Sequence, residues 1–132
     1  FESLSKHLKK EAGLIVVDGM TMLYRLDFAL AREKDDGEMY RINSELVRQI
    51  KTLAEIARKR EISVIITNQV YNWEDSVKMV GGDILKYWSK CEIELANEKG
   101  RRIAYLRKHR SLPEKSIQFY IVNEGIKKRG WI

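Results

Sequence analysis

Two short apolar runs predict strands in the first half of the chain. Residues 14–17 are all apolar and are followed by Asp18 and Gly19, and residues 62–66 form a second run that one serine interrupts. Runs of this length between polar or turn residues are typical of strands buried on both faces of a parallel sheet. We therefore expect two central strands here.

Between these runs, apolar residues return at helical spacing in two places. Three leucines predict a helix that begins near residue 21 and ends at the charged segment 32–37. Four further apolar residues predict a long amphipathic helix. The positions are Leu23, Leu26 and Leu30 in the first helix and Leu46, Ile50, Leu53 and Ala57 in the second. Strand, helix and strand in this order imply a parallel crossover, so we expect an α/β fold.

The second half of the chain alternates between apolar and polar residues, as strands do. Segments 91–96 and 101–106 alternate on either side of a hairpin turn at residues 97–100, and residues 117–122 form a last strand. Ahead of them we expect a polar loop up to Gly81, then a short helix from Asp83, a candidate N-cap, to Trp88 in the core. The parallel strands should thus be followed by an antiparallel C-terminal hairpin and strand.

The composition narrows the class of protein. A chain of 132 residues with 44% hydrophobic residues can bury one modest core. Its single cysteine, Cys91, cannot form an internal disulfide, which suits a reducing compartment and by default the cytoplasm. No apolar run approaches the ~18 residues of a membrane span. His7 and His109 lack partners at metal-ligand spacing, and no nucleophile stands beside a base, so we expect neither a zinc site nor a hydrolase of another class.

The positive charge of the chain is concentrated in one segment. The net charge of +6 comes from 25 Lys and Arg against 19 Asp and Glu. Residues 99–110 hold six basic residues and no acidic one. They are Lys99, Arg101, Arg102, Arg107, Lys108 and Arg110. The segment is either a solvated basic hairpin or a contact for the phosphates of DNA or nucleotide.

The polar residues most suited to ligand binding follow the two predicted parallel strands. Asp18 ends the first strand, and Asn68 and Gln69 follow the second. In open parallel sheets, ligands bind beyond the carboxyl ends of the strands. A carboxylate there can hold Mg²⁺, usually through water, and a neighbouring amide can sense a γ-phosphate. Many strands end in Asp, so this feature alone is weak evidence for a metal site.

Five motifs occur in the order seen in recombinases of the RecA superfamily. They are LIVVDGMTMLYR at residues 14–25, VIITNQV at 64–70, GGDIL at 81–85, RIAYL at 102–106 and SLPE at 111–114. Phe119 and residues 125–126 extend the match, and the sequence KHR at residues 108–110 looks most like the archaeal RadB group. The resemblance covers nearly the whole chain, and five ordered motifs are far more specific than one.

This resemblance implies a role for several residues and a fold for the whole chain. Asp18 would be the Walker B carboxylate that holds Mg²⁺ near ATP, with Asn68 at the nucleotide and Gln69 linking nucleotide state to a DNA-facing loop. Lys108 and Arg110 would reach the γ-phosphate of a neighbouring subunit, or else contact DNA. Residues 1–132 would be the C-terminal portion of a single truncated RecA-like ATPase domain, which fits a chain that begins with Phe1.

One part of the ATPase pattern does not occur in this chain. The phosphate-binding motif G-x-x-x-x-G-K-[ST] is absent, because Gly125 and Gly130 have its spacing but Trp131 and Ile132 follow. Without that cradle we expect neither appreciable MgATP binding nor turnover from the chain alone. Whether the chain is itself an enzyme is therefore left open by the sequence.

The resemblance also predicts DNA contacts. The segment after Gln69 resembles the second DNA-binding loop of recombinases, but it is short, so we expect weak or no strand exchange. Trp73 could stack on a base, with Lys78 at a phosphate, or could pack against its own domain. Together with Arg101, Arg102 and Arg107, these are the candidate DNA-binding residues.

The predicted partners are single-stranded or branched DNA and neighbouring subunits or other recombination proteins, with no membrane. Two other readings stay open at this point. A KaiC-like regulatory ATPase shares the basic Lys-x-Arg arrangement, and a basic DNA-binding module would use no nucleotide at all.

Overall fold

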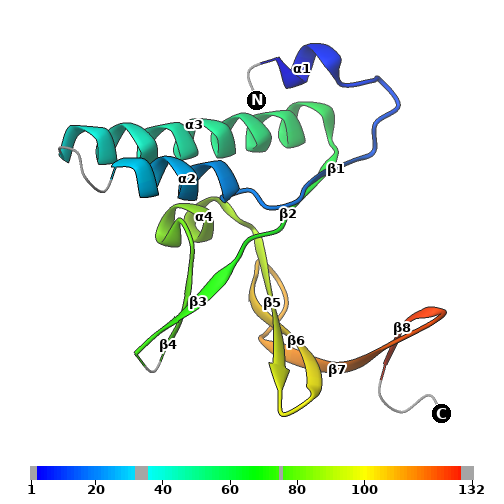
Figure 1. The fold of residues 1–132 in the computed structure, drawn as a ribbon. Helices are drawn as coiled ribbons and strands as arrows, with labels where there is room; N and C mark the ends of the chain where they lie inside the picture. The colour runs from blue at the N-terminus through cyan, green and yellow to red at the C-terminus, as the bar shows by residue number, and fades with distance from the viewer. Residues whose placement is uncertain (1–2, 32–35, 75, 129–132) are drawn as a thin grey trace. The chain divides into compact units, whose positions relative to one another are not determined.

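The computed structural model describes residues 3–31, 36–74 and 76–128, which group into two units along the chain (Figure 1). The first unit runs over Phe1–Trp88 and the second over Ser89–Ile132. The first holds the helices and a parallel strand pair, and the second is an antiparallel sheet.

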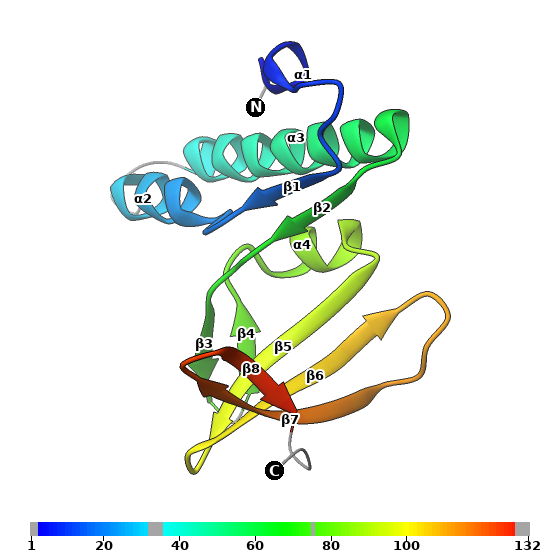
Figure 2. The ribbon, with the colours of Figure 1, turned by 90° about the vertical axis from the view of Figure 1, so that its right-hand side faces the viewer.

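The parallel pair consists of β1 (Leu14–Val17) and β2 (Ser63–Ile66), with Leu14 opposite Ser63 and Val17 opposite Ile66. Figure 2 shows the two strands side by side below α3 (Asp36–Arg60), the long helix that precedes β2 in the chain. The predicted parallel α/β crossover is confirmed.

The core of the first unit is the apolar stripe of α3. Its buried residues recur at helical spacing, and Ile15, Met20 and Leu85 pack with most of them. They are Ile42, Leu46, Ile50, Leu53 and Ile56. The helix begins at Asp36, within the segment 32–37 that was expected to be a loop, and Ile42 extends its buried stripe by one turn before Leu46. The stripe also ends on Ile56, whereas Ala57 had been predicted.

The strands are buried on one face only, which corrects the expectation of burial on both. Ile15 is 8% exposed, whereas Leu14 and Val16 on either side of it are 51% and 58% exposed. Successive side chains of a strand point to opposite faces of the sheet. In the part of the chain that the structure describes, α3 covers one of these faces and the other stays open.

The helix α2 (Met22–Ala31) exists as predicted, but its leucine stripe does not face the core. Leu23, Leu26 and Leu30 are 65%, 58% and 74% exposed. The helix packs through Tyr24 instead, whose hydroxyl donates a hydrogen bond to Asn43 Oδ1 of α3 at 3.0 Å. Most of the expected loop after this helix, residues 32–35, lies outside the described residues.

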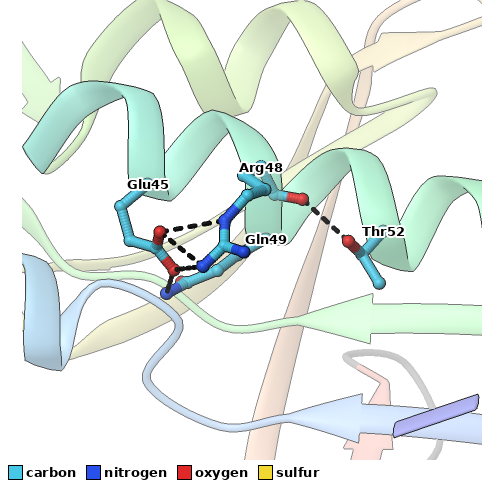
Figure 3. Close-up of polar contacts among 4 residues, drawn as sticks. All are labelled: Glu45, Arg48, Gln49 and Thr52. Atoms are coloured by element: carbon cyan, nitrogen blue, oxygen red, sulfur yellow. Dashed lines mark hydrogen bonds and ion pairs between the residues drawn. The ribbon is translucent and has the colours of Figure 1, made fainter. Parts of the chain in front are cut away.

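The solvent-facing flank of α3 carries a local polar network (Figure 3). The guanidinium of Arg48 donates to both carboxylate oxygens of Glu45, and Gln49 donates to the same carboxylate at 3.1 Å. Thr52 Oγ1 donates to the Arg48 carbonyl oxygen at 2.9 Å. Side-chain pairs three or four residues apart, such as those of Glu45 with Arg48 and Gln49, contribute about 0.2–0.5 kcal/mol each to a helix. The buried stripe therefore stabilises α3 more than this network does.

Two short antiparallel strands lie where the sequence pattern predicted a loop after Gln69. They are β3 (Val70–Trp73) and β4 (Ser76–Met79), with Val70 opposite Met79. Valine and aromatic residues favour strands, and the polar residues between them hid this signal.

Two short helices complete the first unit. In α4 (Gly82–Trp88), Leu85 is buried and Trp88 packs against the core, as predicted for Trp88. Asp83 lies within the first turn of α4 rather than capping it. The chain begins with α1 (Leu4–His7), where the Arg60 guanidinium donates to backbone carbonyl oxygens and so ties α1 to the end of α3.

The second unit is a four-stranded antiparallel sheet in the order β5-β6-β7-β8. The strands are β5 (Cys91–Glu98), β6 (Arg101–His109), β7 (Lys115–Val122) and β8 (Gly125–Lys128). The antiparallel hairpin and following strand are confirmed, and β8 is an addition to them. Lys99 and Gly100 at the β5–β6 turn have φ values of 51° and 83°, as a two-residue turn with left-handed residues requires.

None of the helices in the described part of the chain is both long and apolar enough to cross a membrane.

Candidate functional site

The polar residues that follow β1 and β2 meet at one edge of the parallel pair. Because Val17 lies opposite Ile66, Asp18 and Thr67 leave the strands side by side. Backbone hydrogen bonds fix this edge: Thr67 N–H donates to the Val17 carbonyl at 3.0 Å, and Met20 N–H donates to the Thr67 carbonyl at 3.0 Å. The structure thus brings Asp18 together with the segment that carries Asn68 and Gln69.

Thr67 holds the carboxylate of Asp18. Its hydroxyl donates to Asp18 Oδ1 at 2.5 Å and accepts a hydrogen bond from Gly19 N–H at 2.7 Å. Within the described ranges, Asp18 Oδ2 has no hydrogen-bond partner, and the residue is exposed. One carboxylate oxygen is therefore oriented by the protein, and the other is open to water or to an ion.

Asn68 is held at both ends of its side-chain amide. Thr21 Oγ1 donates to Asn68 Oδ1, and Asn68 Nδ2 donates to the Val80 carbonyl at 2.7 Å. Thr21 is only 2% exposed. Asn68 thus links the start of α2 to the end of the β3–β4 hairpin. Its contact with a nucleotide stays a prediction, and a structural role accounts for both bonds.

Gln69 is held through its side chain and its backbone. The guanidinium Nη1 of Arg25, on α2, donates to Gln69 Oε1. The Gln69 carbonyl accepts a hydrogen bond from Val80 N–H at 3.1 Å, which closes the base of the β3–β4 hairpin. The β3–β4 hairpin, which resembles a DNA-facing loop, therefore begins directly after Gln69, at the carboxyl end of the parallel strand pair.

Sequence reasoning missed three residues of this site: Thr21, Arg25 and Thr67. Thr67 could have been suspected, because it stands beside Asn68 in a polar triplet that ends a strand. Thr21 and Arg25 gave a weaker signal, since a polar residue before a helix and a single arginine on it have many other uses.

The β3–β4 hairpin presents Lys78 on an exposed surface. Lys78 lies directly opposite Tyr71 in the strand register, so a cation and an aromatic ring share one face of the hairpin. Tyr71 also raises the pKa of Tyr24, after the larger effect of burial. The backbone of Trp73 lies in β3, and its side chain is outside the described part of the structure.

Acidic residues of the β5–β6 hairpin neutralise part of its own positive charge. Arg107 Nε donates to Glu94 Oε2 at 2.6 Å, and its guanidinium carbon lies 4.3 Å from the centre of the Tyr105 ring. The hydrogen bond to Glu94 raises the pKa of Arg107, and a hydrogen bond to Glu98 likewise raises the pKa of Tyr105. Arg107 is therefore a weaker candidate for DNA than the sequence implied.

Arg101 and Arg102 are the cations at the start of β6. Both are exposed at the start of β6 and lie opposite Glu98 and Asn97, respectively. Neighbouring residues of a strand point to opposite faces. The two guanidiniums thus offer positive charge on both faces of the hairpin tip.

Lys108 and Arg110 occupy different local structures. Lys108 lies in β6 opposite Glu92, whereas β6 ends at His109 and Arg110 is the first residue of a bend. His109 Nδ1 shapes that bend by accepting hydrogen bonds from the backbone N–H groups of Ser111 and Leu112, each at 3.1 Å. Lys108 and Arg110 therefore do not both extend from one side of a strand, because Arg110 lies beyond the end of β6.

A parallel strand pair with a carboxylate and amides at its carboxyl ends is typical of α/β nucleotide-binding proteins. The chain belongs to the Rad51 family, whose model matches residues 2–129.

The curated relatives of the chain include archaeal proteins named "DNA repair and recombination protein RadB". The one from Methanocaldococcus jannaschii is 41% identical over 119 residues, which cover 90% of this chain and 54% of the relative. The relative from Methanobrevibacter smithii is 41% identical over 124 residues, which cover 88% of this chain and 50% of the relative. A relative from Methanococcus maripaludis is 35% identical over 132 residues, which cover 96% of this chain and 60% of the relative. The predicted resemblance to the RadB group is confirmed, and the chain spans about half the length of these relatives.

Proposed function

We propose that residues 1–132 are the C-terminal portion of a single RecA-like ATPase domain in a RadB-type DNA repair and recombination protein. The family match over residues 2–129 and the names of the relatives support this. The observation that carries the ATPase part is the Asp18 carboxylate, held by Thr67 at the carboxyl end of the parallel pair.

Asp18 has the chemistry that a magnesium site needs. Mg²⁺ prefers oxygen ligands, keeps several waters and is commonly held by one or two carboxylates. Bound there, the ion would neutralise charge on the phosphates of ATP. Asp18 Oδ2 would hold the ion through water, while Thr67 keeps Oδ1 in place. Gln69 would contact the γ-phosphate from the neighbouring strand end.

The intact protein would bind DNA weakly and mainly through charge. Arg101 and Arg102 are exposed cations of the β5–β6 hairpin, and Lys78 lies opposite Tyr71 on the β3–β4 hairpin. Phosphate contacts of this kind give affinity without sequence preference. We propose single-stranded or branched DNA as the nucleic acid that this surface contacts.

Lys108 and Arg110 would contact the γ-phosphate in a neighbouring subunit of the intact oligomer. Their support is their positive charge and their place before the rigid Leu112-Pro113. Alanine at either position should lower ATP turnover or ATP-dependent assembly and leave nucleotide-free DNA binding nearly unchanged. Equal loss of DNA affinity with normal turnover would assign the two residues to DNA instead.

The direct test is ATP binding by the full-length protein with and without Mg²⁺. Wild-type protein should bind ATP more tightly with Mg²⁺, and Asp18→Asn should remove most of that difference, because it removes the charge that attracts the ion. An unchanged magnesium effect in Asp18→Asn would refute the assignment.

A further inference from the structure

Arg25 and Gln69 are joined across the first unit although 44 residues separate them in sequence. Arg25 Nη1 donates to Gln69 Oε1. The Arg25 N–H donates to the Thr21 carbonyl at 3.0 Å, so Thr21 lies one helical turn earlier. Thr21 in turn donates to Asn68. The start of α2 therefore holds two consecutive side chains of the segment that follows β2.

The partner of Gln69 decides which end of its amide faces outward. A guanidinium has donors only, so the amide must turn its oxygen toward Arg25. The amide nitrogen, with two N–H donors, then points to the other side. Among the described residues, Gln69 Nε2 has no hydrogen-bond partner. The group that Gln69 offers to a ligand is thus a pair of donors.

A pair of donors fits one class of ligand chemistry. N–H groups attract an anionic oxygen, and the bond to a charged acceptor is stronger than the bond to a neutral one. Gln69 also lies at the edge where Asp18 ends its strand, and its carbonyl is fixed by Val80 N–H at 3.1 Å. Backbone position and side-chain orientation are therefore both set before a ligand arrives.

We propose that Arg25 is a positioning residue that keeps the Gln69 amide nitrogen turned outward, so that the site distinguishes a nucleoside triphosphate from a diphosphate by its terminal phosphate. This inference rests on the proposed function, in which this edge faces ATP in the intact protein. Without the arginine, the amide can turn over and present its oxygen, which repels a phosphate. The preference for the triphosphate depends on this orientation.

A purely structural tie between α2 and the end of β2 makes a different prediction. Loss of such a tie lowers stability and weakens triphosphate and diphosphate binding alike. Loss of a positioning residue changes the ratio of the two affinities. The ratio therefore separates the two roles.

The experiment measures dissociation constants of a non-hydrolysable ATP analogue and of ADP with the full-length protein, with magnesium, for wild type, Arg25→Met, Arg25→Lys and Gln69→Met. Arg25→Met keeps the length of the side chain and removes its donors. It should reduce the preference for the triphosphate about tenfold, the effect of losing one hydrogen bond to a charged group. Gln69→Met should do the same, and Arg25→Lys should retain most of the preference because it still donates.

Three outcomes overturn the inference. An unchanged ratio in Arg25→Met would leave Arg25 as a structural tie only. An unchanged ratio in Gln69→Met would remove the group that Arg25 is said to position, whether or not Arg25→Met folds. If wild-type protein binds neither nucleotide, the proposed function itself fails, and the inference falls with it.

Discussion

At the scale of single residues, the candidate site is built from hydrogen bonds between side chains far apart in sequence. Thr67 joins Asp18 across 49 residues, and Thr21 joins Asn68 across 47. Each bond leaves a polar group facing a set direction, and a group fixed beforehand loses less freedom when a ligand binds. The residues that orient Asp18 and Gln69 therefore matter as much as those that would touch the ligand.

Thr67→Val tests the orientation of Asp18. Valine has the shape of threonine but no hydroxyl, so Asp18 Oδ1 loses its donor. Bonds to charged groups contribute about 1.5–3 kcal/mol. We expect the Mg²⁺ concentration for half-maximal ATP hydrolysis by the full-length protein to rise about tenfold. Thr67→Ser keeps the hydroxyl and should stay near wild type. A Thr67→Val protein with the wild-type magnesium requirement would show that this bond does not prepare the site.

Gly81→Ala tests the packing beside Thr21. Gly81 has a φ of +74°, and an added Cβ would lie 3.0 Å from Leu46 Cδ2 and 3.4 Å from Thr21 Cγ2. Left-handed backbone and a crowded core should together lower the free energy of unfolding by about 1–3 kcal/mol. Urea unfolding of the 132-residue chain measures this.

Gly13→Ala is the matched control for that measurement. Its added Cβ would meet no atom within 4 Å, and its backbone is not left-handed. If the two variants unfold at the same urea concentration, the close packing around Gly81 does not contribute to the free energy of unfolding.

At the scale of elements, local periodicity was a good guide to where helices and strands lie and a poor guide to which face they bury. The stripe of α3 was predicted because Leu46, Ile50 and Leu53 recur along one face, and these residues are buried. The stripe of α2 has the same spacing, yet Leu23 is exposed. Spacing defines a helix face, whereas burial depends on which other element covers that face.

Local signals in the sequence were enough to indicate which chain segments lie at one edge of the sheet. Asp18 and Gln69 follow neighbouring strands, and the parallel pair brings these two segments to the same edge. The roles of Arg25 and Thr67 depend on side-chain contacts across the fold, which the sequence pattern does not encode. The same limit explains why Arg107 was named as a DNA-binding candidate, although Glu94 on the neighbouring strand pairs with it.

The tip of the β5–β6 hairpin supports a prediction about DNA. Arg101→Gln with Arg102→Gln should weaken binding of the full-length protein to single-stranded DNA. The slope of log affinity against log salt is negative, and each lost phosphate contact should reduce its magnitude by about 0.7. Two contacts together should reduce it by about 1.4.

A control of equal net charge removes two exposed cations of α3, by Lys51→Gln with Arg58→Gln. These residues lie in the first unit, away from the hairpin in sequence. If this control loses as much affinity and slope as the hairpin variant, overall charge rather than the hairpin tip binds DNA.

At the scale of the whole molecule, the edge that we propose for nucleotide binding occurs in a chain without a phosphate-binding motif. Asp18 and Gln69 lie at the carboxyl ends of the parallel pair, and no G-x-x-x-x-G-K-[ST] sequence occurs in the 132 residues. The relatives are about twice as long as the region they share with the chain. We therefore propose ATP chemistry for the full-length protein and none for this chain alone.

The most direct test compares magnesium-dependent ATP hydrolysis by three proteins: the full-length protein, its Asp18→Asn variant and the 132-residue chain. We expect turnover by the full-length protein, a loss of about a hundredfold or more in Asp18→Asn, in line with the removal of one preorganised electrostatic contact, and only background from the chain. Turnover by the chain that Asp18→Asn abolishes, or normal turnover by the full-length variant, would contradict these expectations.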